Sequence, residues 1–177
     1  MKALALFIFF AVIPLAVADL WAEAKPLAAA SPTGRFVVRT TPGEGVGAIA
    51  TVYELGADGT AYSKQREFRL LNRTSPVDIC ITDSAEVVTF DCWGSMGYEH
   101  AVVWYASNGT VKREYTLKEI LPEKVLAEIT AKHRSRSSIN WRKAQPFFNG
   151  PALLIPDAVG GYVILGDDVI DYQAARN

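Results

Sequence analysis

The sequence predicts an all-β fold, built mainly of antiparallel meanders with one short helix. From Phe36 onward, short runs rich in valine, isoleucine, tyrosine, phenylalanine and threonine alternate with clusters of glycine, asparagine, aspartate and proline. This is the pattern of antiparallel strands and their turns. The chain has 177 residues, of which 50% are hydrophobic and 21% are charged. These values fit one folded domain and exclude a disordered, collagenous or coiled-coil chain.

The first residues have the pattern of a secretory signal peptide, which we expect to cover residues 1–18. Lys2 precedes an apolar run from Ala3 to Val17, and Ala16 and Ala18 are small residues at the positions that a signal peptidase reads. The run has about 15 residues, whereas a membrane span needs about 20. We therefore expect an exported protein, periplasmic or secreted, with no stable membrane anchor after cleavage.

Residues 19–35 are expected to form a linker or flexible arm, because Pro26, Pro32 and Gly34 interrupt any regular periodicity. Residues 36–177 then form a single β-rich domain. Its predicted strands are Phe36–Thr40, Ala48–Leu55, Lys64–Leu71, Val77–Thr82, Val87–Cys92, Ala101–Tyr105, Val111–Leu117, Ser138–Arg142, Ala152–Pro156, Gly161–Leu165 and Asp168–Tyr172.

Side-chain patterns indicate the environment of two of these strands and the position of one helix. Residues 111–117 alternate apolar and polar side chains with a period of two, which predicts a half-exposed strand. Residues 101–105 are apolar at every position, which predicts an interior strand covered on both sides. One helix is expected over Pro122–Lys132, because proline favours the first helical position and Leu126 and Ile129 share a face.

An internal echo supports the β interpretation. Ile49–Tyr53 followed by Asp58-Gly59-Thr60 lies 50 to 52 residues before Ala101–Tyr105 followed by Asn108-Gly109-Thr110. A period near 50 residues, made of about four strands, is the size of one β-propeller blade. The alternative is that two hairpins with good turn residues simply look alike.

Several segments between residues 75 and 122 resemble the blade repeats of exported bacterial β-propeller-like proteins, including a set of functionally uncharacterised ones. They are Ser75–Asp83, Val87–Asp91, Gly97–His100, Val103–Tyr105, Asn108-Gly109 and Leu117–Pro122. The resemblance implies blade-like sheets. Only two or three blades fit the mature length, whereas closed propellers need four or more. An incomplete propeller, an open stack of sheets, a sandwich, or assembly with other chains therefore stay open.

The two cysteines, Cys80 and Cys92, leave two alternatives, a disulfide or two buried thiols. Export favours oxidation. A two-residue turn at Ser84-Ala85, however, would pair Ile79 with Phe90 and place Cys92 on their apolar face. Cys80 would then lie on the opposite face, outside disulfide geometry, so the sequence favours two buried thiols.

The loop from Cys92 to His100 is the strongest candidate for ligand binding. It combines Trp93, Met96, Tyr98 and His100 with glycines, so it offers contact groups on an adaptable backbone. The structural alternative is an aromatic plug that covers the end of a sheet.

Catalysis and metal binding have weaker support. A hydrolase would use Cys92 or Ser95 as nucleophile and His100 as base, but the spacing supplies no third group to orient the base. With two histidines in the chain we expect no metal site and no cofactor. The carboxylates of Asp167, Asp168 and Asp171 fit a turn better than a calcium loop.

The net charge and the glycosylation sequons limit the classes of partner and modification that the sequence supports. A net charge of -1 offers no polybasic surface for nucleic acid. Asn72 and Asn108 match the glycosylation sequon, although both also fit turns. The sequence thus favours a non-catalytic exported domain that binds a protein or a small ligand. The alternatives are the hydrolase and a structural protein that assembles, for example into a homo-oligomer, through open sheet edges.

Overall fold

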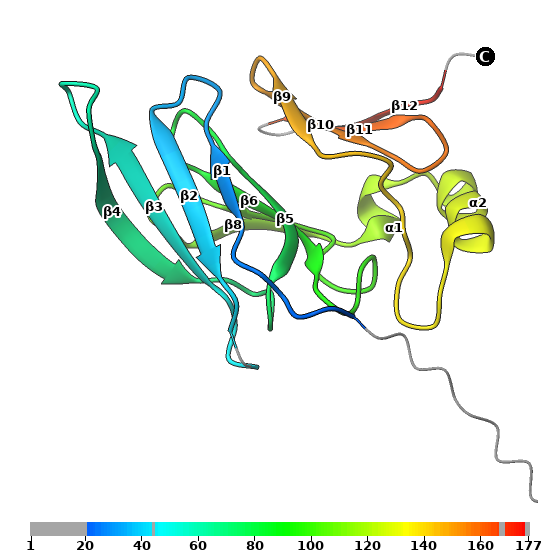
Figure 1. Cartoon of the computed structure of the whole chain (residues 1–177). Helices are drawn as coiled ribbons and strands as arrows, with labels where there is room; N and C mark the ends of the chain where they lie inside the picture. Colours follow the sequence, from blue (N-terminus) through cyan, green and yellow to red (C-terminus); the bar gives the residue numbers. More distant parts are fainter. Residues whose placement is uncertain (1–20, 44, 167–168, 176–177) are drawn as a thin grey trace, which may run out of the picture.

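The computed structural model describes residues 21–43, 45–166 and 169–175, and they form three consecutive four-stranded antiparallel sheets (Figure 1). Sheet 1 contains β1 (Ala28–Ala30), β2 (Phe36–Thr41), β3 (Ile49–Leu55) and β4 (Tyr62–Arg69). Sheet 2 contains β5 (Pro76–Ile81), β6 (Val87–Cys92), β7 (Val102–Tyr105) and β8 (Val111–Tyr115). Sheet 3 contains β9 (Phe147–Asn149), β10 (Ala152–Pro156), β11 (Tyr162–Leu165) and β12 (Ile170–Gln173). Within each sheet the strands are adjacent in chain order, so the predicted all-β class with antiparallel meanders is confirmed.

Two short helices separate sheet 2 from sheet 3 along the chain. The predicted helix is present as α2 (Glu123–His133), with Pro122 directly before it. A second helix, α1 (Leu117–Ile120), was not expected. It forms because the Glu119 carboxylate accepts a hydrogen bond of 2.7 Å from the backbone N–H of Thr116, which ends β8 and starts a helical turn.

Sheet 2 lies between the other two sheets and takes part in two hydrophobic cores (Figure 1). Val87 and Val103 belong to the core shared with sheet 1, whereas Val88 and Phe90 belong to the core shared with sheet 3 and the helices. Every residue of β6 and β7 is therefore buried, which confirms the prediction of an interior strand over residues 101–105. Each such side chain contributes about 1.5–3 kcal/mol of transfer free energy.

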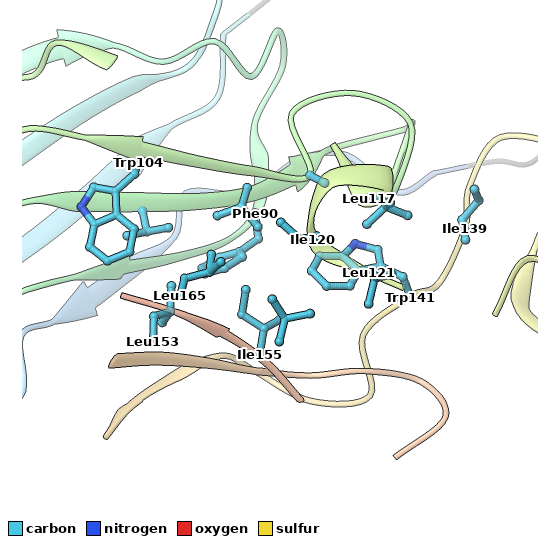
Figure 2. Packing of buried hydrophobic residues seen from close by; sticks show 14 of the residues in the cluster. Phe90, Trp104, Leu117, Ile120, Leu121, Ile139, Trp141, Leu153, Ile155 and Leu165 are labelled. Carbon is cyan, nitrogen blue, oxygen red and sulfur yellow. The ribbon is translucent and has the colours of Figure 1, made fainter. Parts of the chain in front are cut away.

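The larger core fills the space between sheet 2, sheet 3 and α1. Figure 2 shows Phe90 and Trp104 from sheet 2 facing Leu153, Ile155 and Leu165 from sheet 3. Figure 2 also shows that the remaining labelled members of this core close one end of it: Leu117, Ile120, Leu121, Ile139 and Trp141. This end of the core supports the loop that follows β6.

The two segments that echo each other in sequence occupy the same place in sheets 1 and 2. Each forms the third strand of its meander, β3 or β7. Each strand also has a register shift just before the tyrosine that ends the echoed segment, Tyr53 or Tyr105. In the turns that follow, the side-chain oxygens of Asp58 and Asn108 accept hydrogen bonds from the backbone N–H two residues later. The echo therefore has a matching local geometry in two successive sheets.

The predicted register of the β5–β6 hairpin is wrong by one residue. The turn has three residues, 83–85, rather than two, because Ala85 adopts a left-handed backbone with φ 64° and Thr82 N–H bonds to the Glu86 carbonyl at 2.9 Å. As a result Ile79 pairs with Thr89 and not with Phe90. Alanine at a left-handed position gives no sequence signal, and this explains the error.

Several boundaries also differ from the prediction. Residues 28–30, inside the expected linker, form β1 because they pair with β2 at the edge of sheet 1. The predicted strand over residues 138–142 is absent, and this stretch makes isolated bridges from Ile139 and Arg142 instead. β9 was not predicted. β4 begins and ends two residues earlier than expected, β8 ends two residues earlier, and β12 begins two residues later and ends one residue later.

The expected signal peptide, residues 1–18, lies outside the described residues. In the part of the chain that the structure describes, neither helix has the length and apolar character that a membrane span requires.

Candidate functional site

The four predicted binding residues lie in the β6–β7 loop, but they point to different places. Trp93 is covered by the N-terminal arm: the ring of Trp21 packs edge-on against it with centroids 5.2 Å apart. The Trp93 indole nitrogen also donates a hydrogen bond of 2.9 Å to the carbonyl of Ala22. Trp93 therefore contacts the arm, and it also lines a separate surface pocket of about 330 Å³ together with Gly94 and Ser95.

His100 and Met96 also have structural partners. The His100 Nδ1 atom lies 2.6 Å from a carboxylate oxygen of Glu114 on β8, and the backbone of His100 is left-handed with φ 50°. The Met96 carbonyl accepts a hydrogen bond of 2.8 Å from the N–H of Ile139. These contacts fix the loop against β8 and the segment after α2.

Tyr98 differs, because its side chain is 40% exposed and lines a surface pocket of about 420 Å³. Its hydroxyl accepts a hydrogen bond of 3.2 Å from Nε of Arg134, which orients the ring at the pocket rim. The other lining residues come from the same loop, from both helices and from the segment after α2: Gly97, Thr116, Leu117, Lys118, Leu126, Thr130 and Ile139.

The wall of this pocket depends on Gly97. Its backbone has φ 78°, and an added Cβ would lie 2.9 Å from both the Cβ atom and the carbonyl oxygen of Ile139. Its N–H donates a hydrogen bond of 2.9 Å to the buried carboxylate of Asp91. Glycine is needed here both for the left-handed conformation and for the close approach of the neighbouring segment.

Asp91 in turn is the centre of a buried polar cluster beneath the loop. Its carboxylate accepts hydrogen bonds from the indole nitrogen of Trp141 at 2.8 Å and from Nε of Arg142 at 3.2 Å. Arg142 also contacts Asp78 at 3.3 Å. Burial raises the pKa of Asp91, while the Arg142 charge and the hydrogen bonds act in the opposite direction. This cluster is joined to the pocket wall by the hydrogen bond from Gly97 to Asp91.

The pocket has an apolar floor and a polar rim. Leu117, Leu126 and Ile139 supply aliphatic side chains, Tyr98 supplies an aromatic ring with a hydroxyl, and Lys118 is the basic residue of the lining. Such a combination suits a small, partly apolar molecule that carries an acidic group. The sequence pointed to Tyr98 only, because the other lining residues are far apart in the chain and no local pattern joins them.

The cysteines are free, in agreement with the favoured alternative of two unbridged thiols. The expected position of Cys80 was wrong, however, because Cys80 pairs with Val88 and packs against the core that contains Phe90. Cys80 is half-buried and its thiol contacts the carbonyl of Pro146 at 3.7 Å, whereas Cys92 is buried and contacts the amide nitrogen of Asn72 at 3.6 Å. Burial raises the pKa of Cys80 to about 12 and also raises the pKa of Cys92. Both groups are therefore poor nucleophiles at neutral pH.

The proposed hydrolytic pair is not assembled in this structure. The His100 ring is engaged with Glu114 rather than with Cys92 or Ser95. Over the described ranges, no group of three or more histidine, cysteine, aspartate or glutamate side chains has the arrangement of a metal site. Asp167 and Asp168 lie outside the described residues.

The two sequon asparagines have different environments. The side chain of Asn72 is fully buried and its amide donates a hydrogen bond of 2.6 Å to the carbonyl of Asp91, so a glycan does not fit there in the folded chain. Asn108 lies in an exposed turn and accepts hydrogen bonds from Thr110.

Comparison with known proteins gives no match: no protein-family model, no curated protein and no solved structure is significantly similar to this chain.

Proposed function

We propose that this chain is a non-catalytic, exported binding domain, and that its ligand site is the pocket lined by Tyr98. The pocket itself carries the proposal, because it unites one predicted contact residue with an apolar floor and a cationic rim. A protein ligand would insert an apolar side chain with a neighbouring carboxylate, and a small ligand would present the same two features.

Hydrogen bonds hold several residues of the pocket wall in place, which supports its role as a binding site. Gly97 is held by Asp91, Tyr98 by Arg134, and the start of α1 by the Thr116–Glu119 cap. A site whose walls are already ordered loses little conformational entropy when a ligand enters.

The binding test uses anilinonaphthalene sulfonate, an aromatic anion whose fluorescence increases in apolar pockets. Thr130→Trp would fill the pocket from α2, and Ala127→Trp places the same side chain on an exposed position of the same helix as its control. We expect the Thr130→Trp variant to lose the fluorescence increase and the Ala127→Trp variant to retain it. Equal binding by both variants would refute the site.

A second matched pair of variants tests the contribution of the Lys118 charge to binding. Lys118→Glu reverses the charge at the pocket, and Lys124→Glu makes the same change at an exposed position on α2. We expect about a tenfold rise in the dissociation constant for Lys118→Glu, equal to about 1.4 kcal/mol, and no change for Lys124→Glu.

Export is part of the same proposal and rests on the pattern of residues 1–18. Expression of the full chain in a secreting host, followed by mass measurement of the recovered protein, tests it. We expect a chain that begins at Asp19, and recovery of an unprocessed intracellular chain would contradict this.

A further inference from the structure

We propose that two copies of this chain associate by packing sheet 3 of each copy against sheet 1 of the other. The inference does not depend on the ligand pocket. It starts from two sheet faces that have no neighbouring sheet in the described chain: the outer face of sheet 3 and the outer face of sheet 1, each turned away from sheet 2 (Figure 1).

The outer face of sheet 3 carries an apolar row. Leu153, Ile155, Val163 and Leu165 are buried toward sheet 2, so the alternating residues of the same strands point outward. Phe147, Leu154 and Ile164 are direct cross-strand neighbours on that outer face, and Phe147 is 46% exposed. Leu154 and Ile164 are half-buried beside it, so the row combines one exposed aromatic ring with two partly covered aliphatic side chains, as a contact surface would.

The packing of consecutive sheets repeats within the chain. The repeat shows which kind of surface packs against the free face of a sheet. Sheet 1 packs one face onto sheet 2, and sheet 2 packs its opposite face onto sheet 3. In both steps an arginine of the fourth strand reaches the next sheet: Arg66 bonds the carbonyl of Ala85, and Arg113 bonds the carbonyl of Gly166. Both arginines pair with the residue just before the register shift of the third strand, so their positions are equivalent.

Sheet 1 offers the matching surface. Tyr105 in sheet 2 packs against Phe68 of sheet 1 with ring centroids 5.3 Å apart, and its hydroxyl accepts a hydrogen bond from the N–H of Leu71. Tyr53 holds the equivalent place in sheet 1, on the face that no preceding sheet covers, and it pairs with Val37. The outer face of sheet 1 therefore carries the kind of side chain that packs between sheets elsewhere in the molecule.

Charge also favours this pairing. Arg39 is exposed on the outer face of sheet 1, beside Thr51, while Lys64 and Glu67 pair with each other at 2.9 Å. The apolar row of sheet 3 ends at Asp171, which is the neighbour of Ile164 on β12 and is exposed. An acidic group at the edge of one face and a basic group on the other steer the two faces together.

A second copy satisfies both faces at once. The contact joins different surfaces, so two copies close into a ring of six sheets only when a twofold rotation relates them, and any other rotation gives a larger ring or an open filament. In such a ring, the second chain covers the outer faces of sheet 1 and sheet 3 that the described residues leave open.

The test is the solution mass of the mature chain over a wide range of protein concentration, by light scattering and sedimentation. We expect twice the chain mass, with dissociation on dilution. Leu154→Arg and Tyr53→Glu should each give monomers, while Val111→Arg, at an exposed position on β8, should remain dimeric. Circular dichroism checks that each variant is folded, and Ile164→Arg replaces Leu154→Arg if that variant fails to fold.

Mixing the two monomeric variants distinguishes this arrangement from others. Leu154→Arg keeps an intact sheet 1 and Tyr53→Glu keeps an intact sheet 3, so the mixture should recover a heterodimer with one native contact. A wild-type chain that stays monomeric at all concentrations would overturn the proposal. So would a dimer that survives Tyr53→Glu, which indicates contact between two copies of sheet 3, or one that is lost only in Val111→Arg, which indicates edge pairing.

Discussion

The carboxylate of Asp91 accepts a hydrogen bond of 2.8 Å from the indole nitrogen of Trp141, and both side chains are fully buried although they lie 50 residues apart. Asp91 is the penultimate residue of β6, an inner strand of the middle sheet, and Trp141 belongs to the segment between α2 and sheet 3. Arg142 supplies the compensating charge. A buried carboxylate is tolerated only with such partners, so this bond fixes the segment against the sheet.

The first prediction concerns this bond. Trp141→Phe keeps an aromatic ring but removes the donor to a buried carboxylate, so we expect a loss of about 2–4 kcal/mol in the free energy of unfolding. Trp104→Phe is the control, because the Trp104 indole bonds the more accessible carboxylate of Glu86 at 2.8 Å. Urea unfolding followed by circular dichroism should show the larger loss for Trp141, and equal losses would contradict the role of Asp91.

Two glycines of the β6–β7 loop allow the cost of backbone strain to be compared with the cost of overpacking. Gly94 and Gly97 both have positive φ, 87° and 78°, but an added Cβ meets nothing within 4 Å at Gly94 and meets Ile139 at Gly97. Gly94→Ala should cost about 1 kcal/mol from backbone strain, and Gly97→Ala should cost about 1–3 kcal/mol more from overpacking. Similar unfolding midpoints for the two variants would show that Ile139 moves aside.

Tyr105 and Tyr53 form another matched pair. Tyr105→Phe leaves the N–H of Leu71 without its acceptor in a partly buried site, so we expect a loss of about 1–2 kcal/mol. Tyr53→Phe removes the same hydroxyl from the outer face of sheet 1 and should cost less than about 0.5 kcal/mol. Chemical denaturation of both variants, at a concentration where the chain is monomeric, measures the difference, and equal losses would contradict the role of the Tyr105 hydroxyl as the acceptor for Leu71.

The cysteines give a prediction that depends on pH. Burial raises the pKa of Cys80 to about 12 from an ordinary value of 9.0, so the folded state keeps its thiol protonated while the unfolded state ionises. Stability contributed by this thiol is fully present below pH 9 and declines as the pH rises from about 9 towards 12.

Thiol titration without reductant checks the same point. Two thiols should react rapidly in denaturant and slowly in the native protein at pH 8, because ionisation and access are both suppressed. No reaction in denaturant would reveal a disulfide, and rapid native labelling would show that Cys80 is accessible.

Most of the strands could be predicted because side-chain alternation and burial act locally. The uniform hydrophobicity of residues 101–105 predicts a strand covered on both sides, and β7 is such a strand. The hairpin register was wrong because Ala85 adopts a conformation that its type disfavours. α1 was missed although Thr116 and Glu119 have the spacing of a capping box, since the preceding alternation dominated the interpretation.

The candidate site was less predictable than the fold. Tyr98 stood out because aromatic residues among glycines form contact loops, but Trp93 in the same loop contacts the arm and lies outside the Tyr98 pocket. Leu126 and Ile139 carry the pattern of ordinary core residues. Their part in the pocket arises from the packing of α2 and the following segment against the loop, which no single window of sequence contains.

The double burial of sheet 2 has a consequence for how the chain reaches its folded state. When residues up to 115 have been synthesised, sheet 1 can cover one side of β6 and β7, while Leu153, Ile155 and Leu165 are not yet present to cover Phe90 and Trp104. A nascent chain at this stage presents a large apolar face to its surroundings. The last third of the protein thus acts as the cover of its centre, and a truncated product that lacks it is a natural substrate for chaperones and proteases.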